Sequence, residues 1–268
     1  MTADPSSPRV AGASARWDVA AYGAFASQRL RPALDLIARI PDIVPRRVYD
    51  LGCGTGSVTR LLAERWPEAT VTGIDASPEM LEAARTTGAK IRWIDADLAG
   101  WTPDEPPDLL FSNAALHLLD DHPALFARLL GFLEPEGVLA VQMPNNFAAP
   151  SHRAIAEIAA DERWRERLSP LIREAPVALP ERYLEMLLPL TARVDLWETT
   201  YWHLLEGEDP VPAWTGGSVL RPFLAALDEH EQRYFTAAYA ERMRAAYPRR
   251  ADGLTPFPFR RLFLLAMR

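Results

Sequence analysis

The chain has 268 residues, of which 49% are hydrophobic and 24% are charged, as is typical of a soluble globular protein. Its formal net charge of −7 argues against a general nucleic-acid- or membrane-binding surface, because phosphate binding requires a basic face. Cys53 is the one cysteine, which excludes an internal disulfide and a multi-cysteine metal site, and the five histidines lack metal-ligand spacing.

Residues 1–16 are mostly small and polar and contain no apolar signal core, so we expect a disordered leader there. No stretch approaches the roughly 18 apolar residues that a membrane-spanning helix needs. We therefore expect a cytoplasmic protein with neither a membrane nor a nucleic-acid partner. The sequence indicates no obligate protein partner.

The elements that follow have a regular order. Apolar residues at helical spacing run from Trp17 to Ile37 and end before Pro41. The pattern then predicts strands over 48–51, 70–74, 91–94, 109–112 and 138–142, with helices over 58–65, 78–86 and 122–133. Short apolar strands that alternate with helices indicate parallel strands joined by right-handed crossovers. The sequence therefore predicts a doubly wound α/β sheet.

The pattern changes after Pro144. It predicts mostly helix over 150–190, strands over 193–204 and 261–266, and a helical insertion over 210–248 that is rich in aromatic residues and arginine. We therefore expect a leader (1–16), N-terminal cap helices (17–41), an α/β core (42–145), a helical segment with a sheet strand (146–206), a helical cap insertion (207–250) and the final core strand (251–268).

A glycine-rich turn follows the first predicted strand in the stretch RVYDLGCGTGSVTRLL, residues 47–62. It has the pattern D-x-G-x-G-x-G, formed by Asp50, Gly52, Gly54 and Gly56. The third glycine of the dinucleotide-binding fingerprint would fall on Ser57. Asp50 is also a poor neighbour for a pyrophosphate and a good one for a cationic ammonium or sulfonium group. The turn lies at the carboxyl end of a strand, where doubly wound sheets bind ligands.

This turn resembles motif I of the S-adenosylmethionine (SAM) methyltransferases, and residues at three further predicted strand ends extend the resemblance. It implies that Asp75 accepts hydrogen bonds from ribose hydroxyls, and that residues near Asp97 and Asn113 contact the adenine and the methionine portion. The implied SAM-binding residues are Asp50, Gly52, Gly54, Gly56, Asp75, Ala76, Asp97, Leu98, Asn113 and Ala114.

A narrower resemblance covers nearly the whole chain after Trp17. The sequence is similar to the trans-aconitate 2-methyltransferase family in the stretches 22–32, 50–59, 73–81, 133–146, 195–205, 219–224 and 257–266. The resemblance implies a Rossmann-like methyltransferase fold: a seven-stranded sheet, mostly parallel with an antiparallel last strand, plus a helical cap. It also implies an EC 2.1.1 enzyme that transfers the SAM methyl group to a carboxylate oxygen of a small polycarboxylic acid, with trans-aconitate as the best single candidate. The products are a monomethyl ester and S-adenosylhomocysteine (SAH).

A carboxylate acceptor is already ionised at neutral pH, since a carboxylic acid in water has a pKa of about 4. We therefore expect a positioning mechanism without a catalytic residue, in which arginines hold the other carboxylates bidentately. The expected acceptor-binding residues are Tyr22, Arg29, Arg31, His117, Tyr201, Trp214, Arg221 and Arg260. Arg261, beside Arg260 at the start of the last predicted strand, is a further candidate arginine.

Other acceptors and classes stay open. The alternative function is a SAM-dependent methyltransferase that acts on a hydroxyl, an amine or a carbon of another small molecule or natural product; as a general base, His117 would suit a phenol or hydroxyl acceptor. The family more often has glutamine at this position. The stretch SNAALHLL, residues 112–119, lacks the (N/D)-P-P-(Y/F/W) segment of the nucleic-acid amino methyltransferases. A SAM-binding protein without methyl transfer and a nucleotide-binding oxidoreductase are the alternatives from other classes.

Overall fold

Seven strands form one sheet in the order β3-β2-β1-β4-β5-β7-β6. The computed structural model describes residues 26–86, 90–173 and 176–268. β7 is antiparallel to both of its neighbours, and β1 to β5 are parallel, which confirms the expected doubly wound seven-stranded sheet. The strands are β1 (Arg47–Leu51), β2 (Thr70–Asp75), β3 (Arg92–Asp95), β4 (Leu109–Asn113), β5 (Val138–Pro144), β6 (Arg193–Leu205) and β7 (Thr255–Met267).

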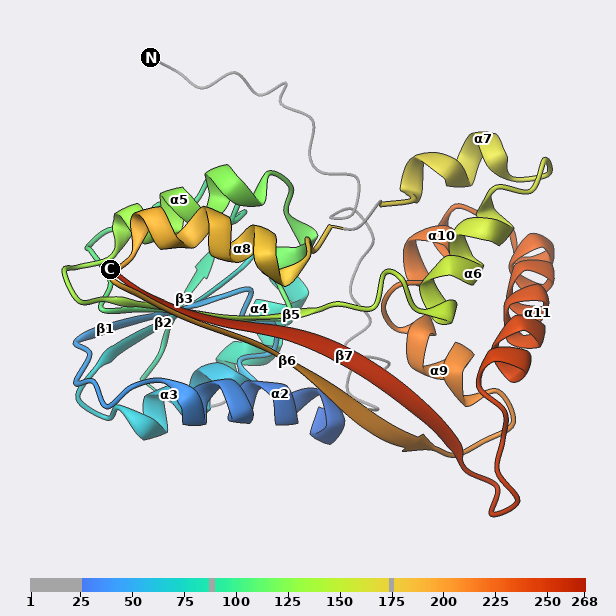
Figure 1. The fold of residues 1–268 in the computed structure, drawn as a ribbon, viewed down its shortest axis with the longest axis horizontal. Helices are drawn as coiled ribbons and strands as arrows, with labels where there is room; N and C mark the ends of the chain where they lie inside the picture. The colour runs from blue at the N-terminus through green and yellow to red at the C-terminus, as the bar shows by residue number, and fades with distance from the viewer. Residues whose placement is uncertain (1–25, 87–89, 174–175) are drawn as a thin grey trace.

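Helices cover both faces of this sheet (Figure 1). One face, here called the α2 face, carries α2 (Ala26–Arg39) and α3 (Ser57–Arg65), and the opposite face carries α5 (His122–Phe132) and α8 (Pro180–Leu187). α4 (Pro78–Arg85) connects β2 to β3. Short 3-10 turns are η1 (Leu116–Leu118), η2 (Ser169–Leu171) and η3 (Leu188–Leu190).

Successive residues of β5 pack alternately into two different hydrophobic cores, one on each face of the sheet. Val138 and Ala140 pack in the core of the α2 face with Leu36, whereas Leu139 and Val141 pack in the core that includes residues of α5 and α8. A strand that is covered on both faces reads as a continuous apolar run. Because residues two apart along a strand share a face, this packing also fixes the face to which later side chains of β5 and β7 point.

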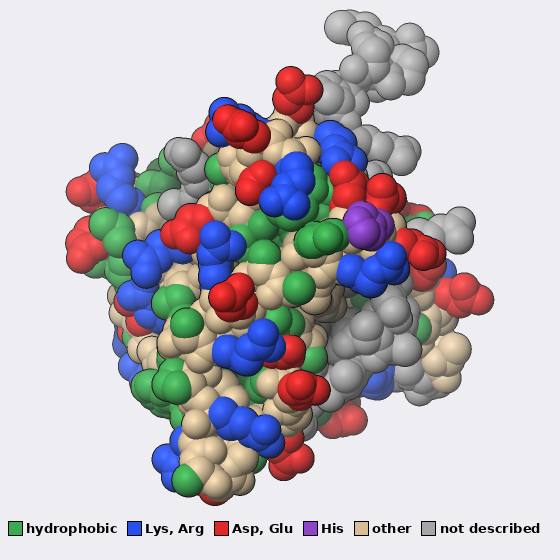
Figure 2. Space-filling view, turned by 90° about the vertical axis from the view of Figure 1, so that its right-hand side faces the viewer, with side chains coloured by type: hydrophobic (Ala, Val, Ile, Leu, Met, Phe, Trp, Pro, Cys, Tyr) green, Lys and Arg blue, Asp and Glu red, His purple; other side chains and the backbone are tan. Residues whose placement is uncertain are grey.

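A second body, the cap, lies beyond the ends of β6 and β7 (Figure 1). Its helices are α6 (Pro150–Ala159), α7 (Arg165–Leu168), α9 (Pro210–Gly216), α10 (Arg221–Ala225) and α11 (Glu229–Ala246). They enclose their own core, which includes Trp164, Phe235 and Tyr239. Figure 2 shows the outer side of this region, where acidic and basic side chains are interspersed.

One expected segment needs correction, and a second is divided between two cores. We expected residues 17–41 in the cap, but the described part of this segment, α2, packs Ala33, Leu36 and Ile37 against the sheet. Helical periodicity marks an apolar stripe without showing what covers it. Within 146–206, α6 belongs to the cap core with α11, while α8 covers the sheet. The predicted leader, 1–16, lies outside the described residues.

β7 is also longer than the predicted strand over 261–266, although its first half contains Pro256 and Pro258. β5 ends at Pro144, which pairs with Arg261, so the earlier residues of β7 pair with β6 alone. Proline lacks an N–H group, and a strand tolerates it where that group would point away from the paired neighbour. Two prolines at alternate positions are therefore compatible with this extended arm.

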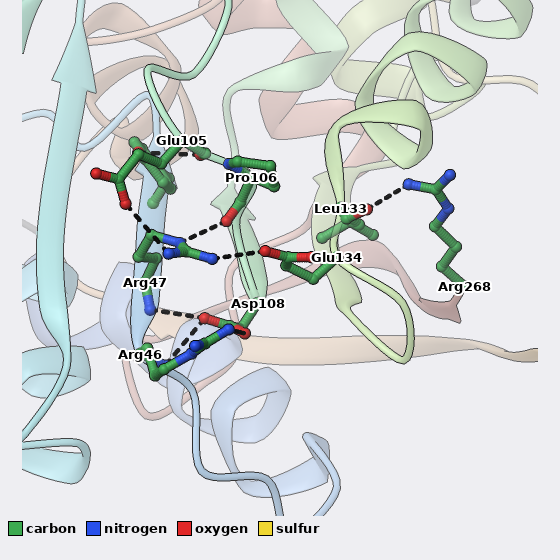
Figure 3. A network of polar contacts seen from close by, with 9 residues as sticks. Arg46, Arg47, Glu105, Pro106, Asp108, Leu133, Glu134 and Arg268 are labelled. Carbon is green, nitrogen blue, oxygen red and sulfur yellow. Dashed lines mark hydrogen bonds and ion pairs between the residues drawn. The ribbon is translucent and has the colours of Figure 1, made fainter.

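A polar network ties together the amino ends of β1 and β4 (Figure 3). Arg47 donates hydrogen bonds to Glu134 at 2.7 Å, to the carbonyl oxygen of Pro106 at 2.6 Å and to Glu105 at 3.1 Å. A carboxylate oxygen of Asp108 accepts from the backbone N–H groups of residues 46 and 47. Among the helices described, none is long and apolar enough to cross a membrane.

Candidate functional site

All three glycines of the turn between β1 and α3 have positive φ, at 77° for Gly52, 55° for Gly54 and 74° for Gly56. A Cβ atom on Gly52 would lie 2.2 Å from that of Ala115, and one on Gly56 would lie 2.4 Å from the Trp93 ring. At Gly54, no other described group lies within 4 Å of the Cβ position. The first and third glycines are therefore required by packing, whereas the space beside the middle one is open among the described residues.

Asp75, at the end of β2, supports this turn. Its Oδ2 accepts a hydrogen bond from the N–H of Gly54 at 2.8 Å, and its Oδ1 accepts one from the N–H of Ser77 at 2.9 Å. Each carboxylate oxygen can accept more than one hydrogen bond, so the group retains capacity for a ribose hydroxyl. Ala76, which follows it, is exposed.

Asp50 lies beneath the turn and is 2% exposed. It accepts a hydrogen bond of 2.6 Å from the Thr59 hydroxyl. The pKa of Asp50 is raised from 3.8 to about 7, mainly because the group is buried; the Thr59 hydrogen bond opposes this rise and the charge of Asp75 adds to it. Two carboxyl groups beside one glycine turn favour a positively charged ligand.

Asp97 and Leu98 lie just past the end of β3. Asp97 is exposed, and its Oδ1 accepts a hydrogen bond from the N–H of Ala99 at 2.9 Å. A side-chain carbon of Leu98 is 4.0 Å from the position of a Cβ on Gly52. The structure therefore brings Leu98 to the glycine turn.

Asn113 and Ala114 stand at the end of β4. The Asn113 Oδ1 is buried without a hydrogen-bond partner among the residues that the structure describes. Ala114 has a φ of 57°, which is strained for a residue with a Cβ, and its N–H donates to the carbonyl oxygen of Gln142 at 2.9 Å. Strained backbone of this kind clusters at ligand sites.

The adjacent arginines of β7 point to opposite faces. Arg261 shares the α2 face with Phe263, is 6% exposed, and has its guanidinium carbon 4.5 Å from the centre of the Phe259 ring. Arg260 instead donates its Nε hydrogen bond to the carbonyl oxygen of Asn145 at 3.1 Å. We expected Arg260 in the acceptor site, but the buried arginine on the α2 face is Arg261.

Two aromatic groups share this face with Arg261. The Tyr201 hydroxyl donates to Asp35 of α2 at 2.6 Å, and the Arg31 guanidinium carbon lies 5.5 Å from the centre of the Tyr201 ring. Trp214 of α9 stacks on His203, with ring centres 4.5 Å apart. Tyr201 thus joins β6 to α2, and His203 joins β6 to the cap.

His117 lies in η1, directly after β4. Its Nδ1 is buried and makes no hydrogen bond within the described part of the chain. The pKa of His117 is lowered to about 3, mainly by burial and in addition by the positive charges of Arg261 and Arg173. Arg173 also donates to the carbonyl oxygen of His117 at 3.0 Å. The imidazole is therefore neutral at physiological pH.

A buried pair holds the η1 turn in place. The His122 Nε2 is 3.1 Å from the carbonyl oxygen of Leu116, and its Nδ1 is 2.6 Å from the Tyr183 hydroxyl. A carbonyl oxygen only accepts, so Nε2 carries the hydrogen and Nδ1 accepts from the tyrosine. Burial lowers the pKa of His122, which favours this neutral tautomer.

Sequence reasoning missed Gln142 in β5. It is 0% exposed, and neither amide atom has a hydrogen-bond partner among the described residues. It is paired with Asn113 of β4 and points to the α2 face. A signal was available, because Gln142 is the one polar residue in the strand VLAVQMP.

Two arginines and a tyrosine complete the set of predicted acceptor-binding residues. Arg221 is partly buried at the first residue of α10, inside the cap. The side chain of Arg29 and the whole of Tyr22 lie outside the described residues.

Comparison with known proteins agrees with this geometry. A methyltransferase domain matches residues 48–137, which span the glycine turn and β1 to β4. The trans-aconitate 2-methyltransferase of Streptomyces coelicolor is 49% identical over 261 residues, covering 93% of this chain and 86% of that protein. The one from Azoarcus sp. is 44% identical, covering 94% of this chain and 99% of that protein.

Solved structures show the fold at lower sequence identity. The YcgJ protein of Bacillus subtilis has a TM-score of 0.58 at 13% identity, covering 89% of this chain and 98% of that one. A methyltransferase-like protein of Bacillus halodurans has a TM-score of 0.56 at 14% identity, with 88% and 98% covered. Given the sheet order, the glycine turn and relatives that match over nearly its whole length, the chain belongs to the trans-aconitate 2-methyltransferase family.

Proposed function

We propose that this enzyme transfers the methyl group of SAM to a carboxylate oxygen of trans-aconitate, giving a monomethyl ester and SAH. The observation that carries the proposal is the buried Arg261 on the α2 face beside the carboxyl end of β5. A buried arginine is well suited to bind a carboxylate. The family's trans-aconitate 2-methyltransferases supply the identity of the acid.

The residues of the turn fit SAM, which supplies an electrophilic methyl group when bound. Gly54 leaves open space above the turn, Asp75 has spare acceptor capacity for ribose hydroxyls, and Leu98 offers an apolar contact for adenine. Asp50, with a pKa of about 7, is partly ionised at neutral pH and largely ionised at pH 8, where its negative charge favours the cationic methionine portion of SAM. Asn113 and Ala114 stand at the adjacent strand end, with a buried unpartnered oxygen among the described residues.

The acceptor side combines arginines with aromatic walls. Arg261 holds a carboxylate, and Arg31 lies on the neighbouring helix above Tyr201. Trp214 brings the cap to this side, because its ring stacks on His203 and lies 5.9 Å from the ring centre of Phe259. The net charge of −7 supports a small-molecule acceptor rather than a nucleic acid or an anionic membrane.

No residue acts as a base. A carboxylate is ionised at neutral pH and attacks without losing a proton. His117, the candidate base for a hydroxyl acceptor, has its pKa lowered to about 3 and is too weak a base for that role. Catalysis then rests on orienting the acid oxygen in line with the methyl group.

The test is SAH release from SAM with trans-aconitate, cis-aconitate, citrate, isocitrate and a phenol as separate acceptors. Turnover confined to the polycarboxylates, with a product that alkali hydrolyses back to the acid, supports the proposal. At saturating SAM the rate with trans-aconitate should be nearly flat between about pH 6 and pH 8.5. Turnover of the phenol alone would move the acceptor to another class and overturn the proposal.

A further inference from the structure

The buried amide group of Gln142 lowers the stability of the folded state, and the described fold supplies no hydrogen bond that compensates for this. The side chain is fully buried, and both amide atoms lack partners among the described residues. A buried polar group without a hydrogen bond destabilises the folded state, so most such groups in proteins are satisfied. An unsatisfied amide at the carboxyl end of a central strand therefore indicates a ligand that completes it.

Its neighbours indicate where that ligand lies. The register places Gln142 between Asn113 of β4 and Phe263 of β7, and Arg261 pairs with the residue two positions further along β5. All four side chains point to the α2 face. The Asn113 Oδ1 and the His117 Nδ1 are likewise buried without described partners. Neutral polar groups thus stand next to one buried cation.

The methyl transfer requires different partners for different carboxylates of one acid. A lone pair of the acceptor oxygen forms the new O–C bond while the C–S bond breaks and leaves its electron pair on sulfur. The carboxylate becomes a neutral ester, the sulfonium becomes a thioether, and no proton moves. The reacting carboxylate therefore loses its charge on the way to the transition state, whereas the other carboxylates keep theirs.

This difference decides which group should bind which carboxylate. An arginine on the reacting carboxylate would stabilise the charged ground state more than the transition state, and would slow the step. A neutral amide donor orients the oxygen and loses less attraction as the charge disappears. An arginine on a carboxylate that keeps its charge carries no such penalty.

We propose that Gln142 donates a hydrogen bond from Nε2 to the carboxylate that receives the methyl group, while Arg261 holds a second carboxylate of the same acid. Gln142 is then an acceptor-binding residue that sets which carboxylate is methylated. This inference rests on the proposed function, because it needs an acceptor with at least two carboxylates.

The experiment compares Gln142→Leu and Gln142→Glu with the wild type. Leucine removes both unsatisfied amide atoms, so the ligand-free Gln142→Leu variant should melt about 2–6 °C higher. Its kcat with trans-aconitate should fall at least 30-fold, while the Kd for SAM stays within threefold. The isosteric Gln142→Glu variant loses the donor and should show the same loss of kcat at pH 8.

Gln232→Leu is the matched control, since the Gln232 Nε2 donates to the carbonyl oxygens of Leu224 and Leu227 at 2.9 and 3.0 Å. This variant should melt lower than the wild type and keep its kcat. If Gln142→Leu does not fold, Gln142→Met takes its place.

The outcomes separate this inference from the proposed function. Wild-type turnover of trans-aconitate with an unchanged kcat in the Gln142 variants would overturn the role of Gln142 alone. So would a loss confined to SAM affinity. Absence of wild-type turnover with every polycarboxylate would overturn the proposed function and this inference together.

Discussion

The two ends of the parallel strands are built in opposite ways. At the amino ends, Arg47 makes three hydrogen bonds, to two acidic side chains and a carbonyl oxygen (Figure 3). At the carboxyl ends, Gln142, Asn113 and His117 have buried polar atoms without partners among the described residues, and Ala114 has strained backbone. Arg47 is satisfied within the chain, whereas these three side chains at the other end leave polar atoms without a partner among the described residues.

This difference separates stability from function. Internal hydrogen bonds at the amino ends stabilise the sheet in the absence of any ligand. Unsatisfied groups at the carboxyl ends lower stability and provide interactions that a ligand completes, a trade-off common to binding sites. Substitutions at the amino ends should therefore lower stability without changing activity, whereas those at the carboxyl ends should lower activity or ligand binding and can raise stability.

The largest effect is expected at Arg261. Arg261→Gln removes a buried cation from the proposed acceptor site, so kcat/KM for trans-aconitate should fall by about 100- to 1000-fold, or about 3–4 kcal/mol. The Kd for SAM should change little. Arg260→Gln, on the opposite face, is the control and should stay within about fivefold of the wild type. Equal losses in the two variants would contradict the assignment of the acceptor carboxylate to Arg261.

A smaller effect is expected at Asp50. Its pKa is raised from 3.8 to about 7, so the folded state holds a proton that the unfolded chain releases at lower pH. The stabilisation is present below pH 4 and is lost as the pH rises to 7, where the buried carboxylate ionises. The rise in the Asp50 pKa corresponds to a loss of roughly 4 kcal/mol in the free energy of unfolding once the carboxylate is ionised. Asp50→Asn should recover about half of this free energy at pH 8.

Urea denaturation of Asp50→Asn and the wild type at pH 5 and pH 8 measures this difference. The gain in the free energy of unfolding should be larger at pH 8. A gain of the same size at both pH values would show that Asp50 does not titrate in this range. The variant should also bind SAM more weakly, because the negative charge beside the cationic ligand is lost.

The amino ends of the strands should respond in the opposite sense. Arg47→Ala breaks its contacts with Glu105, Pro106 and Glu134, and should lower the free energy of unfolding by about 1–2 kcal/mol. Its kcat should equal that of the wild type. Arg182→Ala, which breaks an exposed ion pair with Glu185, should change neither quantity measurably. A loss of kcat in Arg47→Ala without a loss of stability would contradict the separation of the two ends.

The smallest effect is expected at Tyr183. Tyr183→Phe leaves the His122 Nδ1 without its donor and should lower stability by about 1 kcal/mol. Because His122 also contacts Leu116 of η1, the KM for trans-aconitate should rise about two- to threefold, with the KM for SAM unchanged. Equal changes in both Michaelis constants would indicate a general loosening of the fold.

Much of the sheet could be predicted from the sequence, because parallel strands that are covered on both faces leave short apolar runs between helices. The glycine turn was recognisable from the spacing of Gly52, Gly54 and Gly56. The structure shows why Gly52 and Gly56 must be glycines: a Cβ atom there would collide with Ala115 and with the Trp93 ring, respectively. Local sequence does not reveal these contacts, because they join segments far apart in the chain.

The acceptor side was harder to predict. Arg260 and Arg261 differ only in the face to which they point, and both faces of β7 are covered, so no polar alternation distinguishes them. The apolar stripe of α2 fitted a cap as well as a sheet. Gln142 was overlooked because a single polar residue at the end of an apolar run resembles the end of a strand.

A crystal structure of the ternary complex with SAH and trans-aconitate tests these assignments most directly. We expect one carboxylate on the Arg261 guanidinium and another within hydrogen-bond distance of the Gln142 Nε2, facing the sulfur of SAH. Trans-aconitate bound within the cap, without contact to Arg261 or Gln142, would contradict an acceptor site at the carboxyl ends of the strands.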